Sequence, residues 1–284
     1  MIESVELEWR FGTIEVPAPD RYIREAIEVT GEYSGDEIDL YQSLVKPGDV
    51  ALDVGANIGV FSVALGLAVG PSGRVLAFEP QPGIFEILKR NIARHHLPHV
   101  QAHRAMLAEA ERSSLFPDLR TLPAGKKMNF GGISAELRVR REFGAMVTTP
   151  VWTVDGLGLE RCSFVKVDVE GAEQAVLTGA TATIARCRPV LSIEFDRPNA
   201  ASLWVDGLLA AGYRLWRYRG TVLREPNPKA ADIGNYDNFV CIMVVAIPEE
   251  RLVDFAGVDL SSCEAVESRA SLVQLSRGIM VHRP

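Results

Sequence analysis

The sequence predicts an α/β fold with a mostly parallel sheet. Apolar runs of strand length alternate along the chain with longer segments whose apolar residues recur at helical spacing. Strands separated by helical segments form right-handed βαβ units, which place successive strands parallel in one sheet. The clearest unit begins at residues 50–54, an apolar run that ends at Gly55 and leads directly into a second apolar run from Ile58.

The alternation is regular in the first half of the chain. Residues 82–96 carry Ile84, Ile87 and Leu88 at helical spacing, which predicts an amphipathic helix. The shorter apolar runs before and after it have the length of strands. In this half we expect strands at residues 50–54, 74–79 and 99–107, and helices at residues 58–65 and 82–96.

Residues 108–148 interrupt the alternation. Glycine, proline and charged residues break the periodicity there, as in residues 122–127, so we expect an irregular insertion or a β-hairpin over the site. Farther on we expect strands at residues 163–168, 189–195, 213–218 and 238–245, and helices at residues 172–186 and 199–211. The last two strands have no helix between them, which predicts an antiparallel pair at one edge. Residues 249–284 form a polar tail with a weak helical pattern, whose place in the fold the sequence does not indicate.

Composition limits the classes of function. The 284 residues carry a formal net charge of −7 without a long basic run, which argues against a nucleic-acid partner. No stretch of about 18 apolar residues occurs, so we expect neither a membrane span nor a membrane partner. The N-terminus lacks the basic and apolar regions of a signal peptide, which indicates a cytoplasmic protein.

Four residues at the end of the first strand suit a nucleotide-like ligand: Asp53, Gly55, Asn57 and Gly59. A strand that turns directly into a helix presents unpaired helix N–H groups beside a loop without bulky side chains. The dinucleotide fingerprint G-x-G-x-x-G has a glycine where Asn57 stands, so a pyrophosphate cradle is disfavoured. The turn therefore predicts a nucleotide-like ligand and disfavours a dinucleotide.

Glu79 closes the second strand, 20 residues after Gly59. An acidic residue at about this distance accepts hydrogen bonds from ribose hydroxyls in nucleotide-binding folds. The alternative is structural: Asp53 caps the following helix, and Glu79 is a solvated strand end. The two acidic residues together, at these two positions, favour a nucleoside site.

Several motifs together resemble the FkbM-type S-adenosylmethionine-dependent methyltransferases. The resemblance covers residues 10–247 and is carried by residues 31–34, 53–59, 78–80, Asn91, 129–132, 166–173 and 237–239. It implies a class I methyltransferase, a Rossmann-like three-layer sandwich whose seven-stranded, mostly parallel sheet has an antiparallel last strand. The implied methyltransferase domain spans residues 47–248 with the insertion at about 108–148. Residues 1–46 then pack on the cofactor side, and residues 249–284 are the tail.

The resemblance also implies which residues bind S-adenosylmethionine. They are Asp53, Gly55 and Asn57 at the methionine end, Glu79 at the ribose, Gly59 and Pro80 next to these, Ala105 and Met106 near the adenine, and Glu32 and Tyr33 as a cover.

Three ionisable residues alternate with valines at the strand predicted around residues 163–168: Lys166, Asp168 and Glu170. Period-two alternation places them on one face. A central parallel strand is normally apolar on both faces, and an unpaired buried charge costs several kcal/mol. Either these groups form a site, or Lys166 and Asp168 make an internal ion pair while Glu170 caps the next helix. We favour the site.

Glu194 ends the next strand, so Asp168, Glu170 and Glu194 converge if the two strands are neighbours. With Lys166 they are the candidate catalytic residues. In one mechanism a carboxylate, or Lys166 with a pKa lowered by burial, takes the proton from a substrate hydroxyl. In the other, Asp168 and Glu194 hold Mg²⁺ or a similar divalent metal, which acidifies the hydroxyl. We favour the mechanism without a metal.

We therefore expect an S-adenosylmethionine-dependent O-methyltransferase. Its small-molecule acceptor would be a hydroxyl of a sugar or secondary metabolite, a class that comes from the resemblance. The alternative enzyme is a nicotinamide-dependent oxidoreductase, which the G-x-x-x-G loop and the absence of a Tyr-x-x-x-Lys pair disfavour. A non-catalytic binding module with the same fold is the third alternative, which charges inside a strand disfavour. The sequence indicates neither a particular acceptor nor an oligomeric state.

Overall fold

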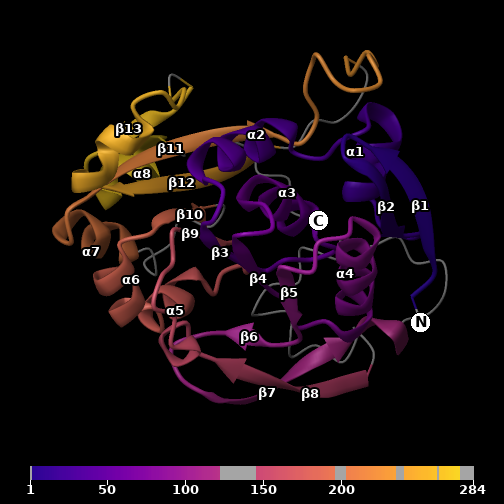
Figure 1. Ribbon diagram of the computed structural model, residues 1–284, viewed down its shortest axis with the longest axis horizontal. Helices are drawn as coiled ribbons and strands as arrows, with labels where there is room; N and C mark the ends of the chain where they lie inside the picture. The colour runs from indigo at the N-terminus through magenta and orange to yellow at the C-terminus, as the bar shows by residue number, and fades with distance from the viewer. Residues whose placement is uncertain (1, 122–144, 196–202, 235–239, 261, 276–284) are drawn as a thin grey trace.

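The computed structural model describes residues 2–121, 145–195, 203–234, 240–260 and 262–275. The expectations for residues 122–127, 129–132, 199–202 and 237–239 fall outside this part of the chain. The described strands form an eight-stranded main sheet, a two-stranded hairpin and a three-stranded small sheet (Figure 1).

Five parallel strands form one side of the main sheet, and their bounds lie close to the predicted ones. In spatial order they are β5 (Val100–His103), β4 (Arg74–Phe78), β3 (Val50–Val54), β9 (Phe164–Val167) and β10 (Val190–Glu194). Next come β12 (Val240–Pro248), antiparallel to both neighbours, then β11 (Tyr213–Thr221) and β13 (Glu264–Val266). The antiparallel pairing of β11 and β12 is confirmed, and the tail adds β13 as an eighth strand.

Helices cover both faces of the main sheet, which is why its central strands are buried on both faces. All five residues of β3 are buried, with Ala51 in the core of one face and Leu52 in the core of the other. The first face carries α2 (Gly35–Leu44), α3 (Val60–Val69) and α4 (Pro82–Arg94). The second carries α5 (Glu173–Thr178), α6 (Thr181–Cys187) and α7 (Trp204–Ala210). The result is the expected three-layer sandwich (Figure 1).

Two predicted elements are divided in the structure. The strand predicted at residues 99–107 ends at His103, and β6 (Met106–Leu107) joins the small sheet instead. The helix predicted at residues 172–186 breaks at Gly179, where a Cβ would overlap the carbonyl oxygen of Ala108. The chain leaving β6 passes directly against this glycine, which lies between α5 and α6.

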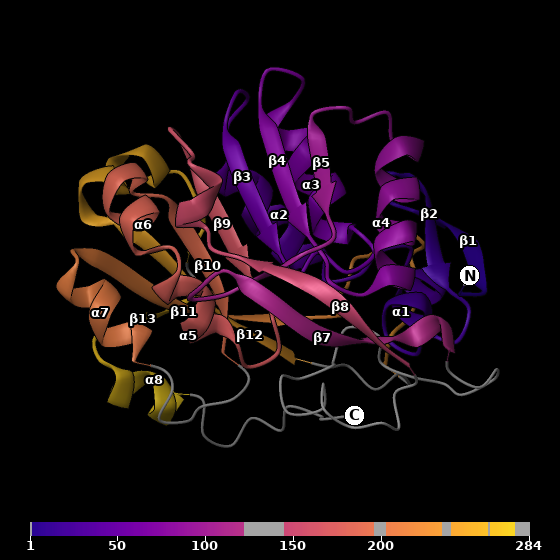
Figure 2. The same ribbon diagram turned by 90° about the horizontal axis from the view of Figure 1, so that it is seen from below.

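The described part of the insertion is a β-hairpin. β7 (Arg112–Asp118) pairs antiparallel with β8 (Ala145–Trp152), and β6 completes the small sheet on the other side of β8. A short 3-10 turn follows β7, η1 (Leu119–Thr121), and another follows β8, η4 (Asp155–Leu157). Figure 2 shows the small sheet beside β4 and β5, as does Figure 1. The hairpin alternative is therefore confirmed for these residues.

The first 46 residues contain a hairpin and two helices. β1 (Ser4–Trp9) pairs with β2 (Gly12–Pro17), and α1 (Ile23–Thr30) precedes α2. The hairpin contacts α4, and α2 packs on α3. The N-terminal segment therefore packs on the face of the main sheet that carries α2, α3 and α4.

The tail continues from β12 along the other end of the sheet. It forms η5 (Glu249–Phe255), β13 and α8 (Arg269–Leu275). Arg217 of β11 pairs with Glu264 and donates to the Leu275 carbonyl, which fastens the tail to the sheet. Among the described helices, none is both long and apolar enough to span a membrane.

Candidate functional site

The loop between β3 and α3 is held by backbone hydrogen bonds to β4. The N–H groups of Gly55 and Ala56 donate to the Phe78 carbonyl at 3.0 and 2.9 Å. Gly55 and Gly59 have φ angles of 86° and 95°, which favour glycine. Asn57 has a φ of 48°, in a region that asparagine adopts more readily than most residues. The residue types of this loop therefore suit its turn.

Both loop glycines also allow close packing. A Cβ on Gly55 would overlap the carbonyl oxygen of Asp168, so the loop and the end of β9 touch directly. A Cβ on Gly59 would lie 2.7 Å from Cδ1 of Leu88 in α4. The candidate cofactor loop and a candidate catalytic residue are thus parts of one packed unit.

Asp53 is fully buried, and its side chain does not cap α3, so the capping alternative is wrong. Its Oδ2 accepts from the Ser62 hydroxyl at 2.6 Å, and its Oδ1 lies 3.9 Å from Nζ of Lys166. Burial raises the pKa of Asp53, although Lys166 and Ser62 act to lower it. Within the described residues, Asp53 Oδ1 and Asn57 Oδ1 are buried and have no hydrogen-bond partner. Two such acceptors fit a ligand that carries polar hydrogens, as S-adenosylmethionine does.

Glu79 is buried, so the alternative of a solvated strand end is also wrong. Its Oε2 accepts the N–H of Asn57 at 3.0 Å, and its Oε1 accepts the N–H of Gln81 at 2.8 Å. The contact of Glu79 to the ribose hydroxyls stays a prediction. Glu79 also donates its own N–H to the His103 carbonyl, which accepts from Ala105 as well. The residues expected at the ribose and at the adenine are therefore neighbours.

The remaining residues of this edge lie where the main sheet meets the small one. Ala105 is fully buried, and the half-buried Met106 begins β6. Pro80 is half-buried directly after Glu79. Their contacts to the cofactor stay predictions.

Glu32 and Tyr33 have different surroundings. The Glu32 carboxylate is fully buried and pairs with Arg10 at 3.2 Å and with Arg224 at 2.7 Å. These ion pairs join the N-terminal segment to the chain that follows β11. Burial raises the pKa of the Tyr33 phenol well above its ordinary value, and the charge of Asp168 adds to this effect. Tyr33 therefore lies within the electrostatic reach of the catalytic candidates, and the role of both residues as a cover stays a prediction.

A buried polar row crosses three central strands on the face that carries α2 and α3. The strand register places Lys166 beside Asp53 on β3 and beside Ser192 on β10. Lys166 is 1% exposed, and its Nζ donates to Oδ2 of Asp168 at 2.9 Å. The same Nζ lies 4.7 Å from the centre of the Phe61 ring. The internal ion pair of Lys166 and Asp168 is therefore confirmed.

The predicted lowering of the pKa of Lys166 is wrong. Burial by itself would lower this pKa, but Asp168, Asp53 and Glu37 together outweigh burial and raise it above the ordinary value. Lys166 is thus a cation at neutral pH. It can hold the carboxylate of Asp168 in place, but it is not poised to accept a proton.

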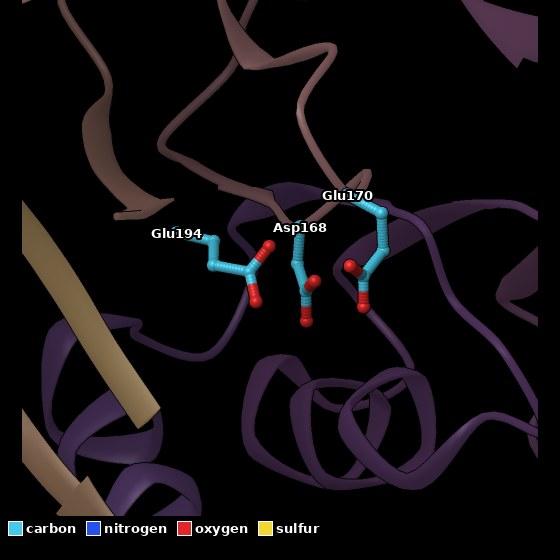
Figure 3. A group of neighbouring side chains, drawn as sticks. All are labelled: Asp168, Glu170 and Glu194. Atoms are coloured by element: carbon cyan, nitrogen blue, oxygen red, sulfur yellow. The ribbon is translucent and has the colours of Figure 1, made fainter. Parts of the chain in front are cut away.

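The predicted convergence of carboxylates is confirmed. β9 and β10 are parallel neighbours, so Asp168 and Glu194 lie at the same edge of the sheet. One carboxylate oxygen from each of Asp168, Glu170 and Glu194 lies within 4.8 Å of the other two. Figure 3 shows these side chains next to one another with their carboxyl groups directed to the same side. All three residues are half-buried, so the group, which we term the carboxylate cluster, is partly accessible.

Glu170 lies in the turn after β9 with a φ of 57°, and its carboxyl group belongs to the carboxylate cluster. The N–H groups of Val169 and Gly171 donate to Glu173, the first residue of α5, at 3.3 and 2.9 Å. Glu173 therefore holds the turn that presents Glu170.

Sequence reasoning missed a buried carboxyl group from α2. Glu37 is 3% exposed, and the Tyr41 hydroxyl donates to it and also forms a 2.8 Å hydrogen bond with Ser192. Burial raises the pKa of Glu37 to about 7, although Lys166 and Tyr41 act to lower it. The signal in the sequence is the spacing of four residues between Glu37 and Tyr41, which places them on one helix face.

Glu37 should make the stability of the chain depend on pH. Its pKa in the folded chain, about 7, exceeds the ordinary 4.5, so between these values the folded chain holds a proton that the unfolded chain releases. We expect this contribution to stability to be lost as the pH rises from about 4.5 to 7, by on the order of 3 kcal/mol. Urea denaturation at pH 5 and pH 8 measures it. Between these two pH values, wild type should lose about 3 kcal/mol more than Glu37→Gln, and equal losses would contradict the expectation.

The strand order, the glycine turn after β3 and the acidic end of β4 define a class I S-adenosylmethionine-dependent methyltransferase fold. Comparison with known proteins supports the same class of protein. The family described as methyltransferase FkbM domain matches residues 53–215, which is more than half of the chain. The chain belongs to this family of S-adenosylmethionine-dependent methyltransferases. The family match favours a methyltransferase over the nicotinamide-dependent alternative.

Three known proteins are similar to this chain. The 31-O-demethyl-FK506 methyltransferase FkbM of Streptomyces tacrolimicus is 31% identical over 209 residues, which cover 65% of this chain and 77% of that protein. The AMB antimetabolite synthetase AmbE of Pseudomonas aeruginosa is 30% identical over 213 residues, which cover 64% of this chain but 10% of the synthetase. A solved structure, methyltransferase FkbM from Methylobacillus flagellatus KT, is 18% identical with a TM-score of 0.44, and the match covers 74% of this chain and 50% of that one.

Proposed function

We propose that this protein transfers the methyl group of S-adenosylmethionine to a hydroxyl oxygen of a sugar or secondary-metabolite small molecule. The observation that carries the proposal is the position of Asp168. Its backbone touches the cofactor loop at Gly55, and its carboxylate belongs to the carboxylate cluster. A methyl donor on the loop and a proton acceptor in the cluster are then neighbours.

The chemistry assigns different tasks to Lys166 and Asp168. When bound, S-adenosylmethionine supplies a methyl group on a sulfonium: the acceptor oxygen bonds to the methyl carbon while the carbon–sulfur bond breaks and its electron pair stays on sulfur. The hydroxyl proton passes to the carboxylate of Asp168, which Lys166 holds through the 2.9 Å hydrogen bond. Positioning of the reactants contributes about 7–11 kcal/mol, and a general base adds roughly 10²–10⁴-fold.

A second mechanism uses the same carboxylates as metal ligands. Hard divalent cations such as Mg²⁺ prefer carboxylate oxygens, and Asp168, Glu170 and Glu194 offer three groups at suitable separations. However, the ammonium of Lys166 already donates to Oδ2 of Asp168, and a metal at that oxygen would face this positive charge. The ion pair therefore favours the mechanism without a metal.

The acceptor class draws on a relative. The name of the Streptomyces tacrolimicus protein describes methylation of an oxygen of demethylated FK506. On that basis we infer that the methyl acceptor of this chain is also a hydroxyl group of a small molecule. The insertion that contains β7 and β8 is the proposed source of specificity, since loops at such edges commonly carry it.

The function is tested with labelled S-adenosylmethionine and a panel of hydroxylated sugars and secondary metabolites. We expect label on an oxygen of at least one acceptor. Calorimetry should show cofactor binding that Glu79→Ala weakens by roughly tenfold or more, because the ribose acceptor and the tether to Asn57 are both lost. Glu79→Gln keeps one acceptor oxygen and should lose less. Label on nitrogen or carbon would exclude O-methylation, and an unchanged affinity in Glu79→Ala would exclude the ribose contact.

A further inference from the structure

Asn91 is fully buried in α4 and binds two other parts of the chain. Its Nδ2 donates to the carbonyl of Ile58 at 2.8 Å and to the carbonyl of Glu15 at 2.9 Å. Its Oδ1 accepts the N–H of Glu15 at 2.8 Å. Ile58 belongs to the candidate cofactor loop and Glu15 to β2, which lies beside α4 (Figure 1). One side chain thus joins the loop to the N-terminal hairpin.

The carbonyl of Ile58 lies outside the hydrogen-bond pattern of α3. Gly59 is the N-cap of this helix, and its carbonyl accepts from Val63. Ile58 precedes this cap and lies between Asn57 and Gly59, which both have positive φ angles. A buried carbonyl at such a place needs a donor from elsewhere, and Asn91 supplies it.

The hairpin has a second attachment to α4 that does not involve the loop. Arg90 donates to both carboxylate oxygens of Glu15, each at 2.7 Å. Arg90 and Asn91 are adjacent and both hold β2 through Glu15, but of the two only Asn91 has a hydrogen bond to Ile58. The pair therefore allows a role at the hairpin to be separated from a role at the loop.

We propose that Asn91 is a positioning residue for the binding of S-adenosylmethionine. Its amide fixes the carbonyl of Ile58 and thereby the backbone of the loop at residues 55–59. The inference rests on the proposed assignment of this loop to the cofactor. Loss of the Asn91 amide then weakens cofactor binding by more than any loosening of the hairpin explains.

The test compares Asn91→Ala with Arg90→Ala in the full chain, with S-adenosylmethionine as the probe. Calorimetry is carried out at a temperature at which circular dichroism shows all proteins folded. The Kd of Asn91→Ala should rise roughly tenfold or more, whereas Arg90→Ala should lower the Tm but keep the Kd within roughly threefold. Equal Kd values in all three proteins, or equal weakening in both variants, would overturn the proposal.

Asn91→Asp is the second variant in case Asn91→Ala does not fold. It keeps an oxygen for the N–H of Glu15 but loses both N–H donors, so a rise in Kd of roughly tenfold is expected here too. A wild-type Kd in this variant would overturn the role of Asn91 alone. Failure of the wild-type chain to bind S-adenosylmethionine would instead overturn the proposed function, and this inference with it.

Discussion

Replacing Gly55 by alanine is expected to weaken S-adenosylmethionine binding by roughly a hundredfold or more, equivalent to about 3 kcal/mol. A residue with a Cβ pays roughly 1–2 kcal/mol for the left-handed backbone that Gly55 adopts. The added Cβ would also overlap the carbonyl oxygen of Asp168, so the loop or the end of β9 must move. Calorimetry gives the affinity, and urea denaturation should show a loss of stability of at least about 2 kcal/mol.

Gly158 provides a matched control for this change. Its φ is also positive, at 61°, but an added Cβ would meet nothing within 4 Å. Gly158→Ala should therefore show the backbone cost alone and leave the affinity for S-adenosylmethionine unchanged. If both variants lose the same stability and bind the cofactor equally well, the contact between Gly55 and Asp168 does not matter for the site.

Replacing Asp168 by asparagine is expected to lower kcat by roughly 10²–10⁴-fold, the contribution of a general base. Asparagine keeps the shape of the side chain but cannot take the hydroxyl proton. The affinity for S-adenosylmethionine should stay within roughly threefold, because the Asp168 backbone, which touches the loop, is unaltered. Transfer of labelled methyl to an accepted hydroxyl compound measures kcat, and calorimetry measures the affinity.

Asp49 is the control carboxylate for this experiment. It accepts from the Ser163 hydroxyl and from the N–H of Lys46, both at 2.8 Å, at the amino end of β3, so Asp49→Asn should leave kcat unchanged. Treatment of the wild-type protein with a chelator separates the two mechanisms. We expect no loss of activity, whereas a loss that Mg²⁺ restores would make Asp168 and Glu194 metal ligands instead.

The sequence allowed the candidate site to be predicted because its residues lie at strand ends. Parallel strands bring their carboxyl ends to one edge, so Asp53, Glu79 and Glu194 could be gathered there from the apolar runs that precede them. The alternation of valines with charged residues around Asp168 predicted this residue as the fourth acidic group at the same edge. These inferences need only local pattern and the rule for βαβ units, and the structure places the residues accordingly.

Charge states and side-chain partners were harder to predict, since they depend on packing between distant segments. The pKa of Lys166 is raised by its near neighbour Asp168, but also by Asp53 on β3 and by Glu37 on α2, and no local pattern connects Lys166 to the last two. Glu32 finds its partner in Arg224, 192 residues farther along the chain. The close approach of Ala108 to Gly179 likewise joins two segments that no local pattern connects.

β13 covers part of the edge of the main sheet that β11 would otherwise form. It pairs with residues 215–217 of β11, a nine-residue strand whose backbone groups would otherwise present a long open edge. Such edges recruit strands from other chains and promote aggregation. β13 itself is three residues long and carries Glu264, which Arg217 holds. The tail thus covers residues 215–217 of the β11 edge with a short, charged strand, a feature that disfavours edge-to-edge pairing there, and this cover comes from residues beyond the 53–215 match to the methyltransferase family.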